Sequence, residues 1–459
     1  MFPQPQRVPT ARRGRLKCGW FRPGVARFHG QSPRDTTSLL GRLFFPQSQA
    51  LGIAPDDTVS PRVLEKMVYA GTQSRSFPQA ERDLKHLAEL DISEQRIARA
   101  TKRIGQERVA ERKAEETAWE TLPLPEQQSS PREQIPRVAC VEMDGGRIQI
   151  RDRNAEESPT EETRKGRFWR ETKVGCLLSM TSETSAVDPC PTIPEIFVDP
   201  RRMGQISREI KGFSAVGEAP TNEESAETPV SEKRRGRPEL LVRSVVATRE
   251  PVEAFGKQLA TAAWQRGFMA ASRKAFVGDG SETNWSVWRR YFSHFTPIVD
   301  FIHGLCYVFA GAMAGRVMEE AWPIYCRWAQ WLWSGQVELV IAALRERQRE
   351  LGRPEKNEAE DSPRCKVSDA LCYLENQGSR MRYDEYRREG LPITSSHIES
   401  TIKQINRRVK GTEKFWSSGG ADALLQLAAD YLSDTHPLTT FWRERVSKAT
   451  GQRHYQTAG

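Results

Sequence analysis

Two short apolar runs, each ending in Asp-Gly, place the strongest constraint on how this chain folds. The first, residues 137–144, reads RVACVEMD and leads into Gly145, and the second, residues 275–279, reads AFVGD and leads into Gly280. Continuous apolar runs of this length are typical of strands that are buried on both faces of a sheet. With the helical patterns around them, these runs predict an α/β fold with a mixed sheet.

Further strand signals complete the predicted sheet. The pair Gly145-Gly146 predicts a tight hairpin directly after Asp144. Residues 181–235 are polar and rich in Pro and Ser, so we expect an exposed insertion there. The remaining core elements are expected as strands over 147–151, 168–180, 240–248 and 274–279 and as a helix over 252–267.

The N-terminal part of the chain divides into an arm and a helical region. Residues 1–59 are rich in Pro, Arg, Gly and Gln and predict an irregular basic arm. Residues 60–121 predict three helices, and Ser93 is placed to cap the last of them. A basic third helix after a short turn is typical of a helix-turn-helix DNA-binding unit, and equally of a helical bundle with a solvated charged face. The three helices are expected over 61–70, 77–90 and 94–116.

The rest of the chain alternates between core and inserted segments. Residues 286–390 are helical in pattern and rich in Trp, which predicts an all-helical insertion. Its tryptophans are expected to be core anchors, with one or two available to stack on flipped bases. The other boundaries are predicted as a linker at 122–136, two core parts at 137–285 and 391–435, and a C-terminal tail at 436–459.

Charge and cysteine usage limit the possible partners and compartment. Lys and Arg exceed Asp and Glu by 69 to 60, and the resulting net charge of +9 is compatible with a polyanion partner. The eight cysteines form no C-x-x-C pair, so we expect reduced thiols and neither a zinc site nor a disulfide framework. The most apolar stretch, residues 298–315, carries Asp300 and His303, and no apolar run follows the N-terminal arginines. We therefore expect no membrane span, no signal peptide and a cytoplasmic, nucleoid-associated protein.

A third acidic residue, Glu399, lies at the start of a long basic helix predicted over residues 395–411. The apolar residues of this helix recur at helical spacing and are expected to face the core. They are Ile398, Ile402, Ile405 and Val409. The adjacent stripe carries Lys403, Asn406 and Lys410, which is typical of a phosphate-binding surface and also of a solvated one. An alternative for Glu399 itself is a capping box with Ser396.

Asp144, Asp279 and Glu399 together provide what a metal-dependent nuclease needs. Two carboxylates leaving buried strands and a third on a helix can converge and hold two divalent metal ions for attack on a phosphodiester. Taken singly, each aspartate has an alternative role as the first residue of an Asp-Gly turn. Glu142 lies two residues before Asp144, so it points to the same face of the strand and is expected to assist.

Two further motifs bear on the site. Asp300 and His303 are three residues apart on one helix face, where they are expected to support the metal ligands, bind metal themselves or form a structural pair. A basic run with Arg234, Arg235 and Arg237 contains Arg-Gly-Arg-Pro, which is similar to the core of an AT-hook that lies in a narrow minor groove. A solvated loop is the alternative for this run.

Five motifs occur together along the chain. They are VEMDGGRIQI, RFWRETKVGCLLSM, AFVGDGSETNW, the tetrad Asp300-Phe301-Ile302-His303 and LPITSSHIESTIKQINRRVKGTEKFW. In combination they resemble the Mutator-type DDE transposases of bacterial insertion sequences, specifically the Kra group. The resemblance runs from about Leu51 to about Leu432. It implies an RNase H-like core interrupted by an all-helical insertion, with an N-terminal DNA-binding region.

The resemblance also implies a site. By position, Asp144, Asp279 and Glu399 correspond to the catalytic residues of a DNA transposase, which hold two Mg²⁺ (or Mn²⁺) ions. Asp300 and His303 match the (Cys/Asp)-x-x-His signature of that family. Contacts to DNA are expected from a set of basic and polar side chains: Lys403, Asn406, Arg407, Arg408, Lys410, Arg234, Arg235 and Arg237.

The implied reaction is metal-dependent cleavage and strand transfer at the ends of an insertion sequence. Its partners would be double-stranded DNA, namely the terminal inverted repeats of the element and the target DNA, held by a homodimer or higher oligomer. Two alternatives stay open at this point. One is a catalytically inactive or domesticated sequence-specific DNA-binding protein, and the other is an RNase H-fold nuclease that cuts without joining.

Overall fold

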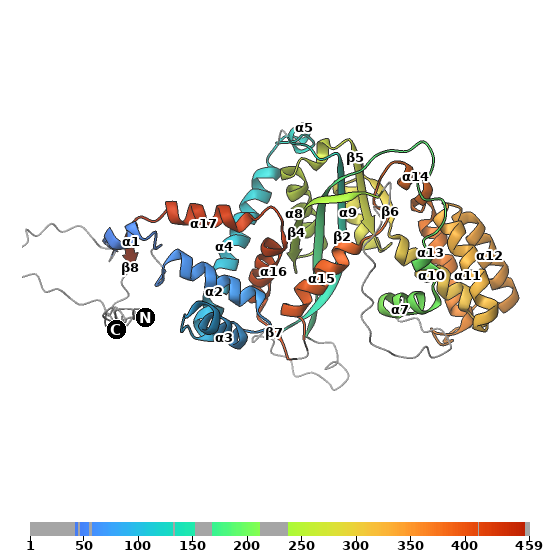
Figure 1. The fold of residues 1–459 in the computed structure, drawn as a ribbon, viewed down its shortest axis with the longest axis horizontal. Helices are drawn as coiled ribbons and strands as arrows, with labels where there is room; N and C mark the ends of the chain where they lie inside the picture. The colour runs from blue at the N-terminus through green and yellow to red at the C-terminus, as the bar shows by residue number, and fades with distance from the viewer. Residues whose placement is uncertain are drawn as a thin grey trace, which may run out of the picture.

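The computed structural model describes residues 42–44, 46–54, 57–131, 134–151, 168–211, 237–411 and 413–454. Most of the predicted basic arm, together with Arg234 and Arg235, lies outside the described residues. The molecule is elongated, with a central sheet between an N-terminal helical region and a second block of helices (Figure 1). No helix in the described part of the chain has the length and apolar character that crossing a membrane requires. The described cysteines are all free thiols.

A six-stranded mixed sheet forms the centre and confirms the predicted α/β class. Its strand order is β4-β3-β2-β5-β6, and β7 pairs with the far end of β2. Strands β2, β3 and β4 are mutually antiparallel, whereas β5 and β7 run parallel to β2, and β6 runs parallel to β5. The strand bounds are β2 Val138–Ile150, β3 Trp169–Thr181, β4 Glu239–Thr248, β5 Arg273–Gly278, β6 Thr296–Val299 and β7 Phe415–Trp416.

The hairpin predicted at Gly145-Gly146 is wrong. Strand β2 continues through both glycines for 13 residues, and they pair with Lys173 and Thr172 of β3. Neither glycine has the positive φ that a two-residue hairpin turn requires. Strand β2 continues as far as Ile150, so Asp144 lies in the middle of a strand and not at its end.

Helices cover both faces of the sheet. A Cβ added at Gly175 of β3 would meet Leu259 of helix α8, while the next residue, Cys176, contacts Thr401 of helix α15. Because alternate strand residues point to opposite faces, α8 and α15 lie on opposite sides of the sheet. The core helices are α8 Val252–Gln265, η2 Phe268–Ala270, α9 Glu282–Tyr291, α15 Ser396–Val409 and α16 Ser418–Leu432.

The helical insertion is shorter than predicted. Residues 286–299 belong to the core, because they complete α9 and contribute β6, which pairs with β5. The predicted charged break at 355–362 separates α12 from α13. The helices of this block, seen on the right in Figure 1, are α10 Phe301–Met313, α11 Met318–Trp333, α12 Val337–Leu351, α13 Pro363–Gln377, η3 Gly378–Arg380 and α14 Tyr383–Arg388.

The segment predicted as an exposed insertion at 181–235 is in part packed. It forms η1, Glu195–Phe197, and α7, Pro200–Lys211, beside the helical block. Phe197 and Met203 are buried there, and the Tyr325 hydroxyl donates a hydrogen bond to the Phe197 carbonyl at 2.7 Å. The polar composition concealed these anchors, which are too widely spaced to form a recognisable period.

The N-terminal helices form as predicted and pack against the C-terminal end of the chain. A Cβ added at Gly105 would lie 2.4 Å from the Ala423 carbonyl oxygen, so the third helix, α4, approaches α16 closely. Phe441 and Trp442 pack in one hydrophobic cluster with buried residues of α2, α3 and α4. They belong to a helix, so the predicted tail at 436–459 is in part helical. The elements of this region are β1 Arg42–Phe44, α1 Pro46–Ala50, α2 Pro61–Gln73, α3 Phe77–Ala88, α4 Glu94–Glu120, α5 Leu124–Gln127, α17 Pro437–Ser447 and β8 Gln452–His454.

Two arginines of α4 serve packing. Arg108 forms an ion pair with Asp430 of α16, with Nε and Oδ2 2.9 Å apart. Arg112 is buried, bonds to Glu116 within α4 and donates to the Gln426 side chain of α16 at 2.8 Å. These arginines are therefore committed to holding the N-terminal region against the core.

Candidate active site

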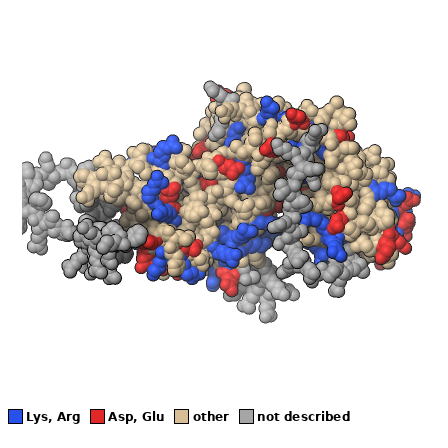
Figure 2. Space-filling view, in the orientation of Figure 1, with Lys and Arg blue, Asp and Glu red and all other residues tan. Residues whose placement is uncertain are grey.

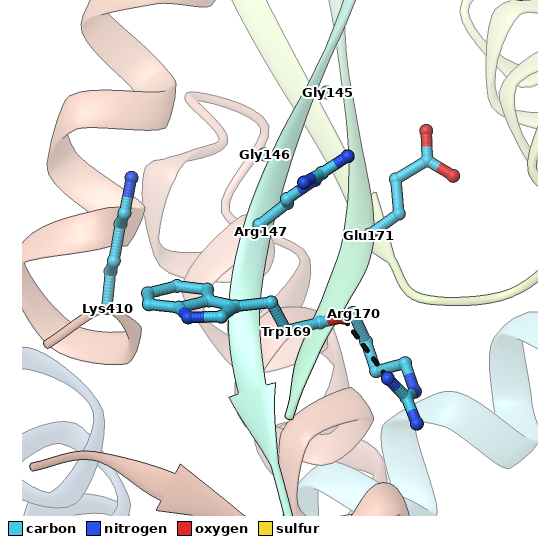
Figure 3. A pocket seen from close by; sticks show the side chains of 7 residues that line it. All are labelled: Gly145, Gly146, Arg147, Trp169, Arg170, Glu171 and Lys410. Atoms are coloured by element: carbon cyan, nitrogen blue, oxygen red, sulfur yellow. Dashed lines mark hydrogen bonds between the residues drawn. The ribbon is translucent and has the colours of Figure 1, made fainter. Parts of the chain in front are cut away.

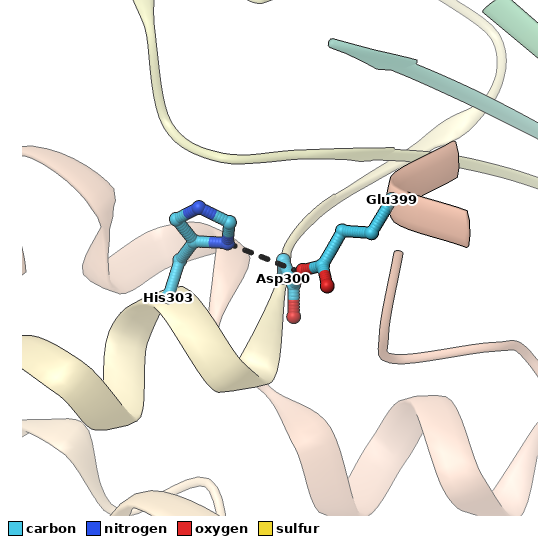
Figure 4. A group of neighbouring side chains, drawn as sticks. All are labelled: Asp300, His303 and Glu399. Atoms are coloured by element: carbon cyan, nitrogen blue, oxygen red, sulfur yellow. Dashed lines mark hydrogen bonds and ion pairs between the residues drawn. The ribbon is translucent and has the colours of Figure 1, made fainter. Parts of the chain in front are cut away.

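Acidic side chains from four elements gather beside the start of α15. Asp300, His303 and Glu399 offer ligand atoms that all lie within 4.8 Å of one another. Figure 4 shows the His303 ring and the Glu399 carboxylate on either side of Asp300. Among the described residues this is the tightest candidate metal group, and it includes one of the three predicted catalytic residues.

Asp300 is the fixed centre of this group. It caps α10, accepting a hydrogen bond at Oδ1 from the Ile302 N–H at 2.8 Å. Its Oδ2 faces His303 Nδ1 at 3.2 Å and also accepts from the Ser395 hydroxyl. Burial raises the pKa of Asp300, but these hydrogen bonds and the His303 charge outweigh it and lower the pKa below its ordinary value. Asp300 is therefore an ionised acceptor, and the predicted pairing with His303 is confirmed.

Glu399 lies in the first turn of α15 with one oxygen unsatisfied. The alternative of a capping box with Ser396 is wrong, because the helix is preceded by Ser395, whose hydroxyl bonds to Asp300. Glu399 Oε1 is buried and has no hydrogen-bond partner within the described chain. Burial and the neighbouring Asp300 raise the pKa of Glu399, while His303 and Lys403 act in the opposite direction.

Glu142 is the buried acid that positions α15. Its side chain is 0% exposed, and Oε2 accepts a hydrogen bond from the Ile398 N–H at 2.9 Å. A carboxylate therefore does cap the backbone at the start of α15, but it belongs to Glu142 of β2 and not to Glu399. Its other oxygen, Oε1, also has no partner among the described residues. Burial, then the charges of Asp300 and Glu399, raise the pKa of Glu142 well above its ordinary value.

Asp144 lies on β2, two residues after Glu142. Its Oδ1 accepts a hydrogen bond from the Gly145 N–H at 2.6 Å. Burial raises the pKa of Asp144, and the charges of Asp279 and Asp300 raise it further, against the effects of the Gly145 N–H and His303. Asp144 in turn contributes to the raised pKa of Glu399. Asp144 is therefore close enough to Asp279 and to Glu399 for their charges to interact, although neither aspartate belongs to the group of three around Asp300.

Asp279 occupies the loop between β5 and α9, in a turn. Its Oδ1 accepts from the Ser281 N–H at 2.8 Å and from Asn284 Nδ2 at 2.9 Å. Asn284 also donates to the Met143 carbonyl at 3.3 Å, so one amide ties this loop to the residue before Asp144. The alternative of an Asp-Gly turn is therefore correct as local geometry, and Asn284 links the Asp279 carboxylate to the backbone next to Asp144.

The helical block fixes the same loop from the other side. The Tyr373 hydroxyl donates to the Asp279 carbonyl at 2.7 Å, and Gln377 Nε2 donates to the Gly280 carbonyl at 3.0 Å. Gly280 has a φ of +96°, and a Cβ there would lie 2.8 Å from the Tyr373 ring. Helix α13 therefore supports the second aspartate, although it lies almost a hundred residues further along the chain.

The predicted DNA-contacting residues divide into exposed and buried ones. Lys403, Arg407 and Lys410 are exposed on α15 or at its end, and Asn406 is half-buried. Figure 2 shows Lys and Arg gathered on the surface over the region where Figure 1 places α15. Arg237 is exposed just before β4.

Arg408 contradicts its predicted role in DNA binding. Its side chain is buried, and Nε and Nη2 both donate to the Gly71 carbonyl at 3.0 and 2.9 Å. The guanidinium lies over the rings of Phe77 and Trp416, 4.5 and 5.0 Å from their centroids. Burial lowers the pKa of Arg408 to about 10. This arginine joins the N-terminal helices to α15 and cannot reach a phosphate.

Several supporting residues had weak signals in the sequence. The position of Glu142 two residues before Asp144 indicated the shared strand face, but not its bond to α15. Asn284 and Ser395 act through contacts with residues far away in the sequence, which no local pattern encodes. Neither a comparison with protein-family models nor a search of curated protein sequences finds a match to this chain.

Proposed function

We propose that this chain is a metal-dependent DNA transposase that cleaves and joins strands at the ends of an insertion sequence. The observation that carries the proposal is the cluster that Asp300, His303 and Glu399 form beside the start of α15, with one buried oxygen of Glu399 that has no partner in the described chain. Oxygen-rich sites of this kind suit Mg²⁺ and Mn²⁺. Net positive charge and the exposed basic residues of α15 are consistent with a DNA partner.

The sheet supports the RNase H-like part of the proposal. Three antiparallel strands are followed by two parallel ones, with α8 and α9 as the connections between β4, β5 and β6. This arrangement is compatible with the RNase H-like core that the resemblance to DDE transposases implies. In the same proposal the three N-terminal helices bind the element's inverted repeats as a helix-turn-helix-like unit, through residues other than Arg108 and Arg112, which pair with side chains of α16.

The donor set fits a divalent cation. Asp144, Asp279 and Glu399 would hold it, and burial raises the pKa of Asp144 and Glu399 in the absence of a bound cation. Bound metal would supply an activated water or 3′-hydroxyl and stabilise the leaving oxygen. Asp300 would orient His303 and hold it beside Glu399, where the imidazole can ligate metal directly or move a proton.

Metal binding is expected to depend on pH in a defined direction. Burial raises the pKa of Asp144 and Glu399, so each holds a proton in the folded chain at pH values where the unfolded chain has lost it. Without metal, these groups therefore lower the free energy of unfolding as pH rises from their ordinary towards their raised pKa values. Mg²⁺ needs the deprotonated carboxylates, so the rise in Tm that it produces should be larger at about pH 8 than at about pH 5. If Mg²⁺ raised the Tm equally at both pH values, Asp144 and Glu399 would not be the metal ligands.

Asn284 is expected to act on metal affinity through Asp279. The variant Asn284→Ala removes the donor to Asp279 Oδ1 and to the Met143 carbonyl. Loss of such a supporting contact typically weakens metal binding by about 10- to 100-fold, and we expect this effect in a calorimetric Mn²⁺ titration. Asn376→Ala, at an exposed position on α13, is the matched control and should leave affinity unchanged. An affinity retained in both variants would show that Asn284 does not support a metal ligand.

Cleavage and joining are separable in one assay. Labelled DNA that carries the sequences flanking the gene is incubated with unlabelled target DNA and Mg²⁺. A transposase yields joined products of greater length as well as cleaved ends. Cleaved ends without joined products would indicate a nuclease of the same fold, and binding without either would indicate an inactive DNA-binding protein. The apparent mass of the protein on end DNA would show whether a dimer or higher oligomer forms.

A further inference from the structure

A groove of about 710 Å³ begins one residue after Asp144 and is not used by the carboxylate site. Its floor is the bare backbone of Gly145 and Gly146. Arg147 stands on the same strand, while Trp169 and Lys410 form one wall in Figure 3. Arg170 and Glu171 line the opposite side.

The floor is open because β2 lacks a strand partner along this edge. Strand β5 pairs with β2 only as far as Glu142, and β7 pairs with it again only from Gln149. Between these two points β3 is the only described strand that pairs with β2. A Cβ added at Gly145 would meet nothing closer than 3.7 Å, so the space above the backbone is accessible.

The groove has an excess of positive charge. Arg147 and Lys410 are exposed, and Arg170 adds a third cation, whose guanidinium also donates to the Trp169 carbonyl at 3.2 Å. The one acid, Glu171, accepts a hydrogen bond from Lys173 Nζ at 2.9 Å, so its charge is compensated. A lining of this kind is complementary to phosphate groups.

Trp169 gives the groove an aromatic surface. Its ring is half-buried, and Lys410 Nζ lies 5.9 Å from the ring centroid. An aromatic ring among cations is what proteins use to bind single-stranded nucleic acid, with the base stacked on the ring and the backbone along the cations. Bases in a duplex are already stacked on each other, so an unpaired strand fits this surface better.

We propose that this groove binds an unpaired segment of the DNA strand that enters the carboxylate site. One base stacks on Trp169, and adjacent phosphates contact Arg147, Arg170 and Lys410. This inference rests on the proposed DNA-cleaving function, and it adds the path and the state of the strand beside Asp144.

The test measures binding of the full chain to short single-stranded DNA and to duplex DNA in EDTA, so that no cleavage occurs. The variants are Trp169→Ala, Trp169→Phe and Lys410→Gln. Trp331→Ala is the matched control, because Trp331 is also half-buried and has Arg327 over its ring at 5.5 Å, within the helical block. Lys356→Gln, at an exposed position between α12 and α13, is the control for Lys410.

We expect Trp169→Ala to weaken single-strand binding by about 5- to 150-fold, the range for loss of one stacked base. Trp169→Phe should retain most of the affinity, and Trp331→Ala should match the wild type. Lys410→Gln should reduce the slope of log affinity against log salt by about 0.7, whereas Lys356→Gln should not. A fluorescent adenine analogue in the strand should be quenched by the wild type and not by Trp169→Ala.

Single-strand binding that is the same in Trp169→Ala and Trp331→Ala would overturn the proposal. An unchanged salt slope in Lys410→Gln would overturn it as well, and this exposed substitution decides the matter if Trp169→Ala fails to fold. The proposed function fails separately: Trp169-dependent binding without cleavage in Mg²⁺ would keep the groove and remove the nuclease activity. Cleavage of end DNA by the wild type, together with single-strand binding that Trp169→Ala leaves unchanged, would keep the nuclease activity and remove the groove.

Discussion

Asp144→Asn is expected to abolish metal-dependent DNA cleavage while DNA binding persists. The substitution keeps the size of the side chain and its acceptor for the Gly145 N–H, but it removes the negative charge that a divalent cation needs. Metal ions contribute several kcal/mol of transition-state stabilisation, so the cleavage rate should fall by about a thousandfold or more. Cleavage of labelled end DNA and gel-shift affinity are measured on the same preparations.

The control for this variant is Asp361→Asn, which changes an exposed aspartate between α12 and α13. It should cleave and bind as the wild type does. If Asp144→Asn also cleaves at the wild-type rate, Asp144 holds no catalytic metal. If it loses binding and Tm together, the effect is on folding, and Glu399→Gln then becomes the variant that decides the role of the site.

Arg408→Ala is expected to lower the free energy of unfolding by about 3 kcal/mol, because hydrogen bonds from a charged donor and a buried cation–π contact are lost together. The variant removes both bonds to the Gly71 carbonyl and leaves a gap between the rings of Phe77 and Trp416. Lysine should not rescue it, since a single ammonium group cannot reproduce the planar fork. Urea denaturation monitored by tryptophan fluorescence measures the change.

Arg407→Ala is the matched control, one residue earlier on the same helix and exposed. Its effect on stability should stay within about 0.5 kcal/mol, as is usual for surface positions. The effects on DNA affinity should be the reverse of those on stability. Arg407→Ala should weaken DNA binding in a salt-dependent way, and Arg408→Ala should have the smaller effect on affinity. A loss of DNA affinity without a loss of stability in Arg408→Ala would instead restore the phosphate contact that the sequence suggested.

The sequence predicted the sheet well where its signals were long. The apolar runs before Asp144 and Asp279 are buried strands, and the basic segment around Glu399 is a helix. Short signals were less reliable. Gly145-Gly146 has the composition of a hairpin turn, but it lies within a paired strand because β3 pairs with both glycines. Local turn chemistry was overridden here by strand pairing.

The supporting contacts of the site could not be predicted, because they join residues that are distant in the sequence. Ser396 and Glu399 have the spacing of a capping box, yet Glu142 on β2 caps the helix and Glu399 Oε1 has no partner in the described chain. Likewise, a helical stripe of basic residues does not reveal that Arg408 is buried while Arg407 is exposed. The cap from Glu142 and the burial of Arg408 both depend on which elements pack together, and a single sequence does not show that packing.

The most direct test of the proposed transposase function is cleavage of labelled DNA carrying the sequences that flank the gene, measured for the wild-type protein with Mg²⁺, with Mn²⁺ and with EDTA. We expect specific strand cleavage with either metal and none with EDTA, because the proposed roles of Asp144, Asp279 and Glu399 require bound cations. Tight binding to the same DNA without cleavage in either metal would contradict it, and would identify the chain as a DNA-binding protein without nuclease activity.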